Sequence, residues 1–211
     1  MLVAGELRII VPDIDLESVA EFINYTRDEY EQSTFFLEDN VYFKRNNRHY
    51  PWNRRVLEFK GVKFFNYDKQ PPFDTVMPIV DSLPVTEKTV ILLYQESQDG
   101  YDFNFHFDAE LDYGFRICFG LDTTKTFLEL GQLKDEYIEH ARQRKKINND
   151  MVTDRIYKLD PLRSNTVLCL NATHYPHRVP INSNQPRAVL IVKGNNTNLS
   201  QLDFLQRIDS F

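Results

Sequence analysis

The sequence predicts a mainly β fold of the α+β class, in which short strands form a sandwich or barrel. The chain of 211 residues contains 16 Phe and 11 Tyr, residue types that fit a pleated, half-buried sheet surface. From residue 88 onwards, eight short apolar or alternating segments follow one another. Turn residues such as Asp-Gly and Asn-Ser separate them, which favours antiparallel strands over a parallel sheet with crossover helices.

The expected strands after residue 88 share an apolar or alternating pattern and a length of six to ten residues. They are TVILLYQES (89–97), DFNFHFDAE (102–110), YGFRICFGLD (113–122), KTFLELG (125–131), DRIYKLD (154–160), NTVLCLN (165–171), PHRVPI (176–181) and RAVLIVKG (187–194). The stretch 132–151 is polar and helix-prone, and we interpret it as an insertion between strands.

The first 87 residues are expected to support this β region. LRIIVP (7–12) predicts a strand, and 13–32 predicts a helix with an apolar stripe and Asp15 as its cap. Residues 41–66 indicate strands broken by a basic loop, and FDTVMPIVDSL (73–83) indicates a second helix.

The whole chain, 1–211, is expected to be one domain, because its length suits a single hydrophobic core. Within it, 1–87 supports the barrel, 88–193 forms the barrel core, and 194–211 ends in a short amphipathic helix.

Composition excludes some classes of protein. The net charge is −6 and the pI is about 5.4, which argues against a nucleic-acid-binding surface. There is no apolar run of the roughly 20 residues that cross a bilayer and no charged-then-apolar leader. We therefore expect a cytoplasmic protein without a membrane partner, whose two cysteines, Cys118 and Cys169, are buried free thiols.

A histidine and an aspartate stand two positions apart in the strand NFHFDAE (104–110). Residues two apart on a strand point to the same face, so His106 and Asp108 project together. A histidine and a carboxylate on one face supply two of the three ligands of a 2-His-1-carboxylate iron site. The alternative is a hydrogen-bonded core pair without metal.

A third ligand would come from another strand, and His174 and His177 are the candidates. His49 lies in the basic loop and His140 in the polar insertion. Arg187 opens the last apolar strand ten positions after His177. A guanidinium at the start of a buried strand is explained if it binds a carboxylate inside the barrel.

His106-x-Asp108, then His177, then Arg187, spread over eight short strands, resembles the Fe(II)- and 2-oxoglutarate-dependent dioxygenases. The resemblance covers about residues 88 to 193 and implies a double-stranded β-helix, a cupin-like jelly roll with flanking helices. It also implies that His106, Asp108 and His177 are the catalytic iron ligands, with His177 favoured over His174, and that Arg187 binds the distal carboxylate of 2-oxoglutarate. The implied reaction consumes 2-oxoglutarate and O2, hydroxylates a C–H bond and releases succinate and CO2.

Within that superfamily, HFDAELDYGFRICFGLD (106–122) and NTVLCLNATHYPHRVPINSNQPRAVLIV (165–192) are similar to the aspartyl/asparaginyl β-hydroxylase branch. The branch implies that Arg116 helps to bind the co-substrate, and that the substrate is an amino acid, a peptide or protein side chain, or a related small metabolite. Two positions depart from the branch: Asp108 is present where an aspartate is often missing, and Cys118 stands where a histidine is common.

Three alternatives stay open. The barrel could be a cupin-like metal-dependent isomerase, although the paired His-x-His and glutamate of that class are missing, or a binding module without catalysis. A nucleobase substrate is the third, because basic residues accompany aromatics at 44–55 and gather again at 142–146. The simpler interpretation of both basic segments is that they form a solvent-exposed surface without a binding role.

Overall fold

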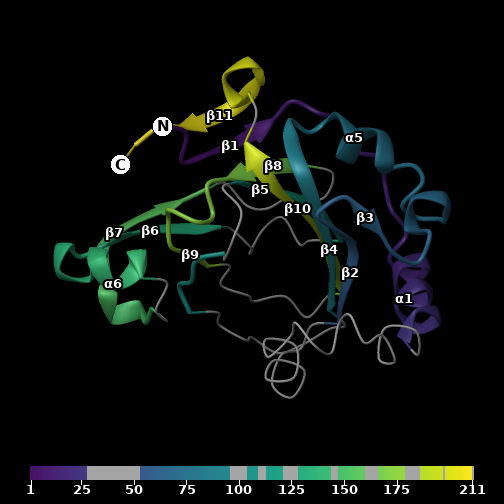
Figure 1. Cartoon of the computed structure of the whole chain (residues 1–211), viewed down its shortest axis with the longest axis horizontal. Helices are drawn as coiled ribbons and strands as arrows, with labels where there is room; N and C mark the ends of the chain where they lie inside the picture. The colour runs from purple at the N-terminus through teal and green to yellow at the C-terminus, as the bar shows by residue number, and fades with distance from the viewer. Residues whose placement is uncertain are drawn as a thin grey trace.

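The computed structural model describes residues 1–27, 53–95, 104–108, 113–120, 128–143, 147–159, 166–178, 186–196 and 198–210. Two antiparallel sheets dominate it (Figure 1). The larger sheet has the strand order β11-β1-β8-β5-β10-β4-β2-β3. Its strands are β1 (Ala4–Leu7), β2 (Asn53–Phe59), β3 (Val62–Lys63), β4 (Val85–Gln95), β5 (Tyr113–Phe119), β8 (Thr166–Leu170), β10 (Arg187–Asn196) and β11 (Phe204–Ile208).

The smaller sheet has the order β7-β6-β9, with β6 (Glu129–Leu133), β7 (Val152–Lys158) and β9 (His177–Arg178). The segment 104–108 extends it, because His106 and His177 form an antiparallel bridge. The His106 N–H donates to the His177 carbonyl at 3.1 Å, and the His177 N–H donates back at 3.0 Å. The segment that carries His106 and Asp108 is therefore hydrogen-bonded to the strand that carries His177.

The path of the chain between the two sheets defines a double-stranded β-helix. β4, β5, β8 and β10 lie side by side in the larger sheet, while 104–108, β6, β7 and β9 make up the smaller one. In sequence order the chain runs β4, 104–108, β5, β6, β7, β8, β9, β10, so it crosses repeatedly between the sheets. The predicted fold class is confirmed, and each of the eight predicted strands contributes a paired segment.

The two faces of the larger sheet pack against different groups of residues. On β10, Ala188, Leu190 and Val192 pack into the cluster that contains α1 and α5, whereas Val189 and Ile191 face the smaller sheet. This alternation follows from the period of two along a strand. Lys193 continues the second set and so faces the interior between the two sheets.

Two helices cover the outer face of the larger sheet beside β4 and β2 (Figure 1). α1 (Leu16–Tyr25) begins after Asp15, whose carboxylate accepts from the Glu17 and Ser18 amides, as predicted. α5 (Met77–Ser82) is shorter than the predicted helix 73–83. Short helical turns complete the chain: η1 (Tyr67–Lys69), η2 (Asp135–Tyr137), α6 (Ile138–Arg142), η3 (Asn149–Met151) and η4 (Leu199–Gln201).

The predicted C-terminal helix within 194–211 is wrong. Leu199–Gln201 forms a single 3-10 turn, and Phe204–Ile208 is the strand β11 paired with β1. The free edge of β1 accepts this strand, and Gly5 makes room for it. A Cβ at Gly5 would lie 2.3 Å from Phe204 Cδ1, so the Phe204 ring packs directly on the backbone of β1.

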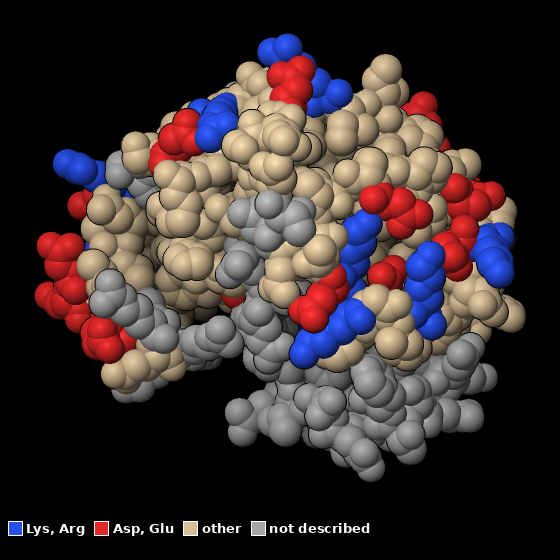
Figure 2. Space-filling model, turned by 45° about the horizontal axis from the view of Figure 1, so that its top comes forward, with Lys and Arg blue, Asp and Glu red and all other residues tan. Residues whose placement is uncertain are grey.

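Two smaller expectations also change. The first strand is β1 at Ala4–Leu7 rather than 7–12, and the expected helix 13–32 is described only as far as residue 27. The basic loop before residue 53 lies outside the described residues. On the face shown in Figure 2, several acidic side chains gather at the lower left edge, while elsewhere acidic and basic side chains are interspersed. Among the described residues, none of the helices is long and apolar enough to cross a membrane.

Candidate metal centre

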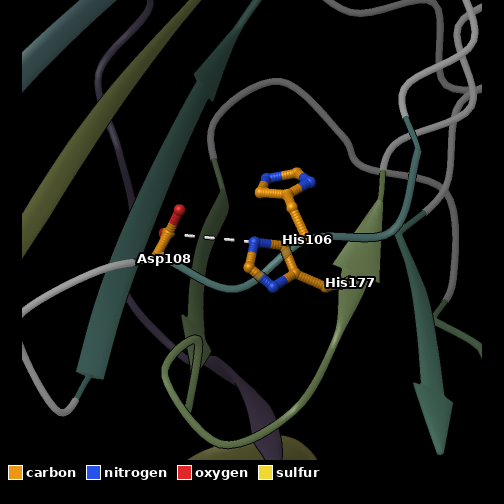
Figure 3. A group of neighbouring side chains, drawn as sticks. All are labelled: His106, Asp108 and His177. Carbon is orange, nitrogen blue, oxygen red and sulfur yellow. Dashed lines mark ion pairs between the residues drawn. The ribbon is translucent and has the colours of Figure 1, made fainter. Parts of the chain in front are cut away.

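His106, Asp108 and His177 converge at the edge of the smaller sheet (Figure 3). One ligand atom from each lies within 4.8 Å of the others. The histidine bridge sets the positions of the two imidazoles, whose ring centroids are 4.5 Å apart. The Asp108 N–H donates to the Ala172 carbonyl at 2.9 Å and so holds the third residue beside them. The structure thus brings together the three residues that the sequence singled out.

The Nδ1 hydrogen bonds of both imidazoles leave Nε2 as the nitrogen whose lone pair could ligate a metal. His106 Nδ1 lies 3.0 Å from the Asn104 carbonyl, and His177 Nδ1 lies 3.2 Å from the Tyr175 carbonyl. A carbonyl oxygen only accepts, so Nδ1 of each ring carries the proton and Nε2 keeps its lone pair. Backbone carbonyls that fix the tautomer in this way are typical of metal-binding histidines.

The electrostatics of the site favour the protonation states that bind metal. Burial lowers the pKa of His106 and lowers the pKa of His177 well below its ordinary value, so both rings are neutral. Burial alone would raise the pKa of Asp108, but the positive charges of Lys193 and Arg116 outweigh it and hold that pKa well below the usual range. Two neutral imidazoles and an ionised carboxylate are the forms that ligate a divalent cation.

The arrangement fits a divalent transition metal. Asp108 Oδ2 is buried, and it lies 3.1 Å from Lys193 Nζ and 3.9 Å from His177 Nε2 (Figure 3). A buried carboxylate is costly unless cations compensate it, and a metal bound here would add to the compensation that Lys193 provides. Two imidazole nitrogens and one carboxylate on one side of a site are the facial donor set of Fe(II) oxygenases.

Two cationic side chains of the larger sheet meet the same donor atoms. Arg116 Nη2 lies 2.9 Å from His177 Nε2 and 3.6 Å from Asp108 Oδ2. Lys193 Nζ lies 3.1 Å from Asp108 Oδ2. The candidate ligands therefore come from the smaller sheet and the cations from the larger one.

Arg187 opens β10 on the same inner face. It is 2% exposed, and burial lowers its pKa to about 10, a value at which the guanidinium is still charged at neutral pH. Val189 pairs with Cys118 on β5, so Arg187 lies on the face that also carries Arg116 and Cys118. The three basic residues Arg116, Arg187 and Lys193 thus share the inner face of the larger sheet.

The other residues considered from the sequence are accounted for as follows. His174 is exposed, and its Nδ1 lies 2.9 Å from Asn171 Oδ1, outside the three-residue cluster. Cys118 and Cys169 are buried free thiols, as predicted, and burial raises the pKa of Cys118 to about 11. Arg55, from the first basic segment, is structural: its guanidinium donates to the Ile23 carbonyl and to Thr26 Oγ1 of the α1 end.

Most of the two basic segments, 44–55 and 142–146, lies outside the described residues or is without a described side chain. Lys193 is the residue of the site that the sequence analysis missed. Its signal was present, because Arg187, Val189, Ile191 and Lys193 follow the period of two along one strand. The pattern of one strand does not show that Lys193 contacts Asp108, because Asp108 lies beside the other sheet.

No family model and no curated protein sequence matches the chain. Among solved structures, the chain is similar to a prolyl-4-hydroxylase from Pseudomonas putida, with a TM-score of 0.52 and 9% identity over 92% of this chain and 93% of that chain. It is also similar to EvdO2 from Micromonospora carbonacea var. aurantiaca, with a TM-score of 0.44 and 15% identity over 92% of this chain and 96% of the other.

A third similar structure is SnoN, a non-heme α-ketoglutarate-dependent epimerase from nogalamycin biosynthesis, with a TM-score of 0.43 and 12% identity over 92% of this chain and 79% of that one. At these identities the likeness bears on the fold alone, and the match to the prolyl-4-hydroxylase supports the double-stranded β-helix. The resemblance to the aspartyl/asparaginyl branch stays a prediction.

Proposed function

We propose that this protein is an Fe(II)- and 2-oxoglutarate-dependent oxygenase that hydroxylates a C–H bond. The observation that carries the proposal is the His106, Asp108 and His177 cluster, in which both Nδ1 atoms are held by backbone carbonyls and Nε2 is the nitrogen left to ligate, inside a double-stranded β-helix. The solved structures to which the chain is similar include a prolyl-4-hydroxylase, which supports the same class.

The three residues would hold the metal from one side. His106 and His177 would contribute Nε2, since their Nδ1 protons are committed to the Asn104 and Tyr175 carbonyls. Asp108 would contribute a carboxylate oxygen. A facial set of three donors leaves the remaining coordination positions of Fe(II) to other molecules.

Two arginines would bind the carboxylates of 2-oxoglutarate. Arg116 lies beside the metal ligands, 2.9 Å from His177 Nε2, and Arg187 lies on the same face beyond Phe119, where β5 ends. Planar guanidinium groups match carboxylate geometry and stay charged when buried. A five-carbon dianion along the inner face of β5 and β10 would therefore find a positive charge near each end.

The apolar surroundings of these groups serve the reaction by excluding water. Ile91, Val189 and Ile191 are buried beside Cys118 in the cluster that lies between the two sheets. When bound, Fe(II) and 2-oxoglutarate would supply the oxidising chemistry together with O2, with release of succinate and CO2. The chain's own contribution is to orient the co-substrate, to keep both histidines neutral and to keep water away.

The substrate is proposed to be an amino acid, a peptide or protein side chain, or a related small metabolite. This part of the proposal is supported by the similarity of residues 106–122 and 165–192 to the aspartyl/asparaginyl β-hydroxylase branch. The aspartate at position 108 supports hydroxylation over halogenation, because it fills the coordination position that a halide would need.

The test is an anaerobic titration of the purified protein with Fe(II) and then 2-oxoglutarate, monitored by visible absorption. The expected result is the weak charge-transfer band of an Fe(II)–2-oxo acid chelate, which Arg187→Met weakens or abolishes. Arg55→Met is the matched control, because Arg55 is 5% exposed but faces α1 instead of the site. The band should survive in this control if circular dichroism shows a folded protein.

Two other results would change the proposed class. If Fe(II) binds but no band forms with 2-oxoglutarate, the barrel is a metal protein of another type, such as a cupin-like isomerase. If Fe(II) does not bind, the His106 and Asp108 pair is a core feature, and a binding module without catalysis takes the place of the oxygenase.

A further inference from the structure

We propose that Lys193 is an internal counter-cation of the metal site that makes metal binding depend on the anionic co-substrate. Lys193 Nζ lies 3.1 Å from Asp108 Oδ2, and its side chain is only 14% exposed. The proposal rests on the oxygenase function proposed above, since it concerns the same site. It assigns Lys193 a role in setting metal affinity, not in the chemical step.

The position of Lys193 follows from the register of the larger sheet. Lys193 pairs with Gly114 on β5, and directly opposed residues of an antiparallel pair share a face. A Cβ at Gly114 would meet, among the described residues, only Ala172 Cβ, at 4.0 Å. The missing side chain leaves space beside Lys193. Asp108 reaches Lys193 while its own N–H donates to the Ala172 carbonyl.

The charges at the donor atoms are unbalanced once a metal is added. Lys193 and Arg116 approach the same oxygen, Asp108 Oδ2, at 3.1 Å and 3.6 Å. One carboxylate thus faces two cations before any metal binds. A divalent metal bound by Asp108 would add two positive charges within a few ångströms of both, in a partly buried site where screening is weak.

Arg116 adds a second obstacle to metal binding. Its Nη2 lies 2.9 Å from His177 Nε2, the nitrogen whose lone pair would ligate the metal. Metal binding therefore requires this hydrogen bond to break, after which the guanidinium of Arg116 needs a new acceptor. The carboxylates of 2-oxoglutarate supply acceptors for Arg116 and negative charge beside Lys193.

Metal and co-substrate should consequently strengthen each other's binding, and part of this coupling should depend on the charge of Lys193. The contrasting role is that of a positioning residue, which would hold Asp108 in place for the metal. The two roles predict opposite signs. Removing a counter-cation strengthens the binding of metal alone, whereas removing a positioning residue weakens it.

The experiment measures Mn(II) affinity from the electron paramagnetic resonance signal of free Mn(II), with and without saturating 2-oxoglutarate. The variants are Lys193→Met, Lys193→Gln as a second neutral residue in case the first does not fold, and Lys193→Arg, which keeps the charge. Lys63→Met is the matched control, because Lys63 forms a lysine–aspartate pair with Asp68 at 2.8 Å on the exposed strand β3.

The expected result is that a neutral residue at 193 strengthens the binding of Mn(II) alone about tenfold, within the usual range of coupling between sites. The additional gain on adding 2-oxoglutarate should shrink by the same factor. Lys193→Arg and Lys63→Met should behave like the unsubstituted protein.

Weaker Mn(II) binding by the neutral variants, or an unchanged gain from 2-oxoglutarate, overturns the role of Lys193 while leaving the oxygenase proposal intact. A different failure is diagnosed by the unsubstituted protein. If it binds no Mn(II) with or without 2-oxoglutarate, the metal site itself is refuted, and the role of Lys193 is refuted with it.

Discussion

Asp108→Asn should destabilise the metal-free protein strongly, even though asparagine has nearly the same size and shape. The substitution removes the negative charge that faces Lys193 at 3.1 Å and Arg116 at 3.6 Å. Both cations are largely buried, with side-chain exposures of 14% and 10%. After the substitution, these two positive charges would face each other and an amide group.

The expected loss can be worked from the distances. At an effective dielectric constant of about 20, each of the two attractions is worth roughly 5 kcal/mol. The desolvation of the Asp108 carboxylate offsets a large part of this sum. Removing one partner of a buried ion pair typically costs about 3–5 kcal/mol, and we expect Asp108→Asn to fall in that range.

The assay is urea denaturation near neutral pH with a chelator present, followed by circular dichroism. Asp68→Asn is the control, because it removes a carboxylate from an exposed pair with Lys63, where about 0–1 kcal/mol is expected. The double variant Asp108→Asn, Lys193→Met should recover part of the stability, since it removes one of the two uncompensated cations. If Asp108→Asn is as stable as the unsubstituted protein, the Asp108 carboxylate does not compensate the charges of Lys193 and Arg116, and the reasoning is refuted.

Three further predictions follow from single contacts. His177→Gln should abolish Mn(II) binding measured by calorimetry. His174→Gln should change the Mn(II) affinity by less than about threefold, because His174 is hydrogen-bonded to Asn171 outside the cluster. Equal losses in the two variants would show that the wrong histidine was assigned. The metal-free protein should lose stability between about pH 7.5 and 5.5, because the lowered pKa of His177 keeps the folded ring neutral while the unfolded ring gains a proton. The stability that the neutral His177 ring contributes is present above the ordinary histidine pKa and is lost as the pH falls below that pKa. The loss is at most about 1.4 kcal/mol at about pH 5.5. In urea titrations, His177→Gln should remove this part of the pH dependence of the unfolding free energy. Asp15→Ala should cost about 1 kcal/mol in thermal unfolding through the loss of the α1 cap, and a change near zero would mean that the cap does not limit stability.

The strands of the barrel could be predicted from the sequence because their signal is local. Alternation over five to ten residues, with a turn on either side, identifies a strand wherever it pairs. The His106 and Asp108 pair was found for the same reason, since the period of two alone places both on one face. Asp15 was identifiable as a cap because capping depends on residues within one helical turn.

The last strand could not be predicted because its pattern is ambiguous. Leu199, Leu202 and Leu205 lie three apart and fit a helix, whereas Phe204 to Ile208 also fits a strand. The structure settles the choice through a distant partner, since β11 pairs with β1 about two hundred residues earlier. Tertiary pairing of this kind overrides local propensity and leaves no mark within the segment itself.

Lys193 was missed for a related reason, and its place shows how the site depends on the fold. The proposed metal ligands lie on the smaller sheet and the cations on the larger one, so the distances between them depend on how closely the sheets pack. Leu128, Leu130, Leu168 and Ile191 are buried between them and set that separation. Because packed side chains resist compression, the 3.1 Å contact of Lys193 with Asp108 is determined by the core rather than by either strand. A residue's place on a face can be inferred from one strand, but its partner across the barrel is determined by all of them.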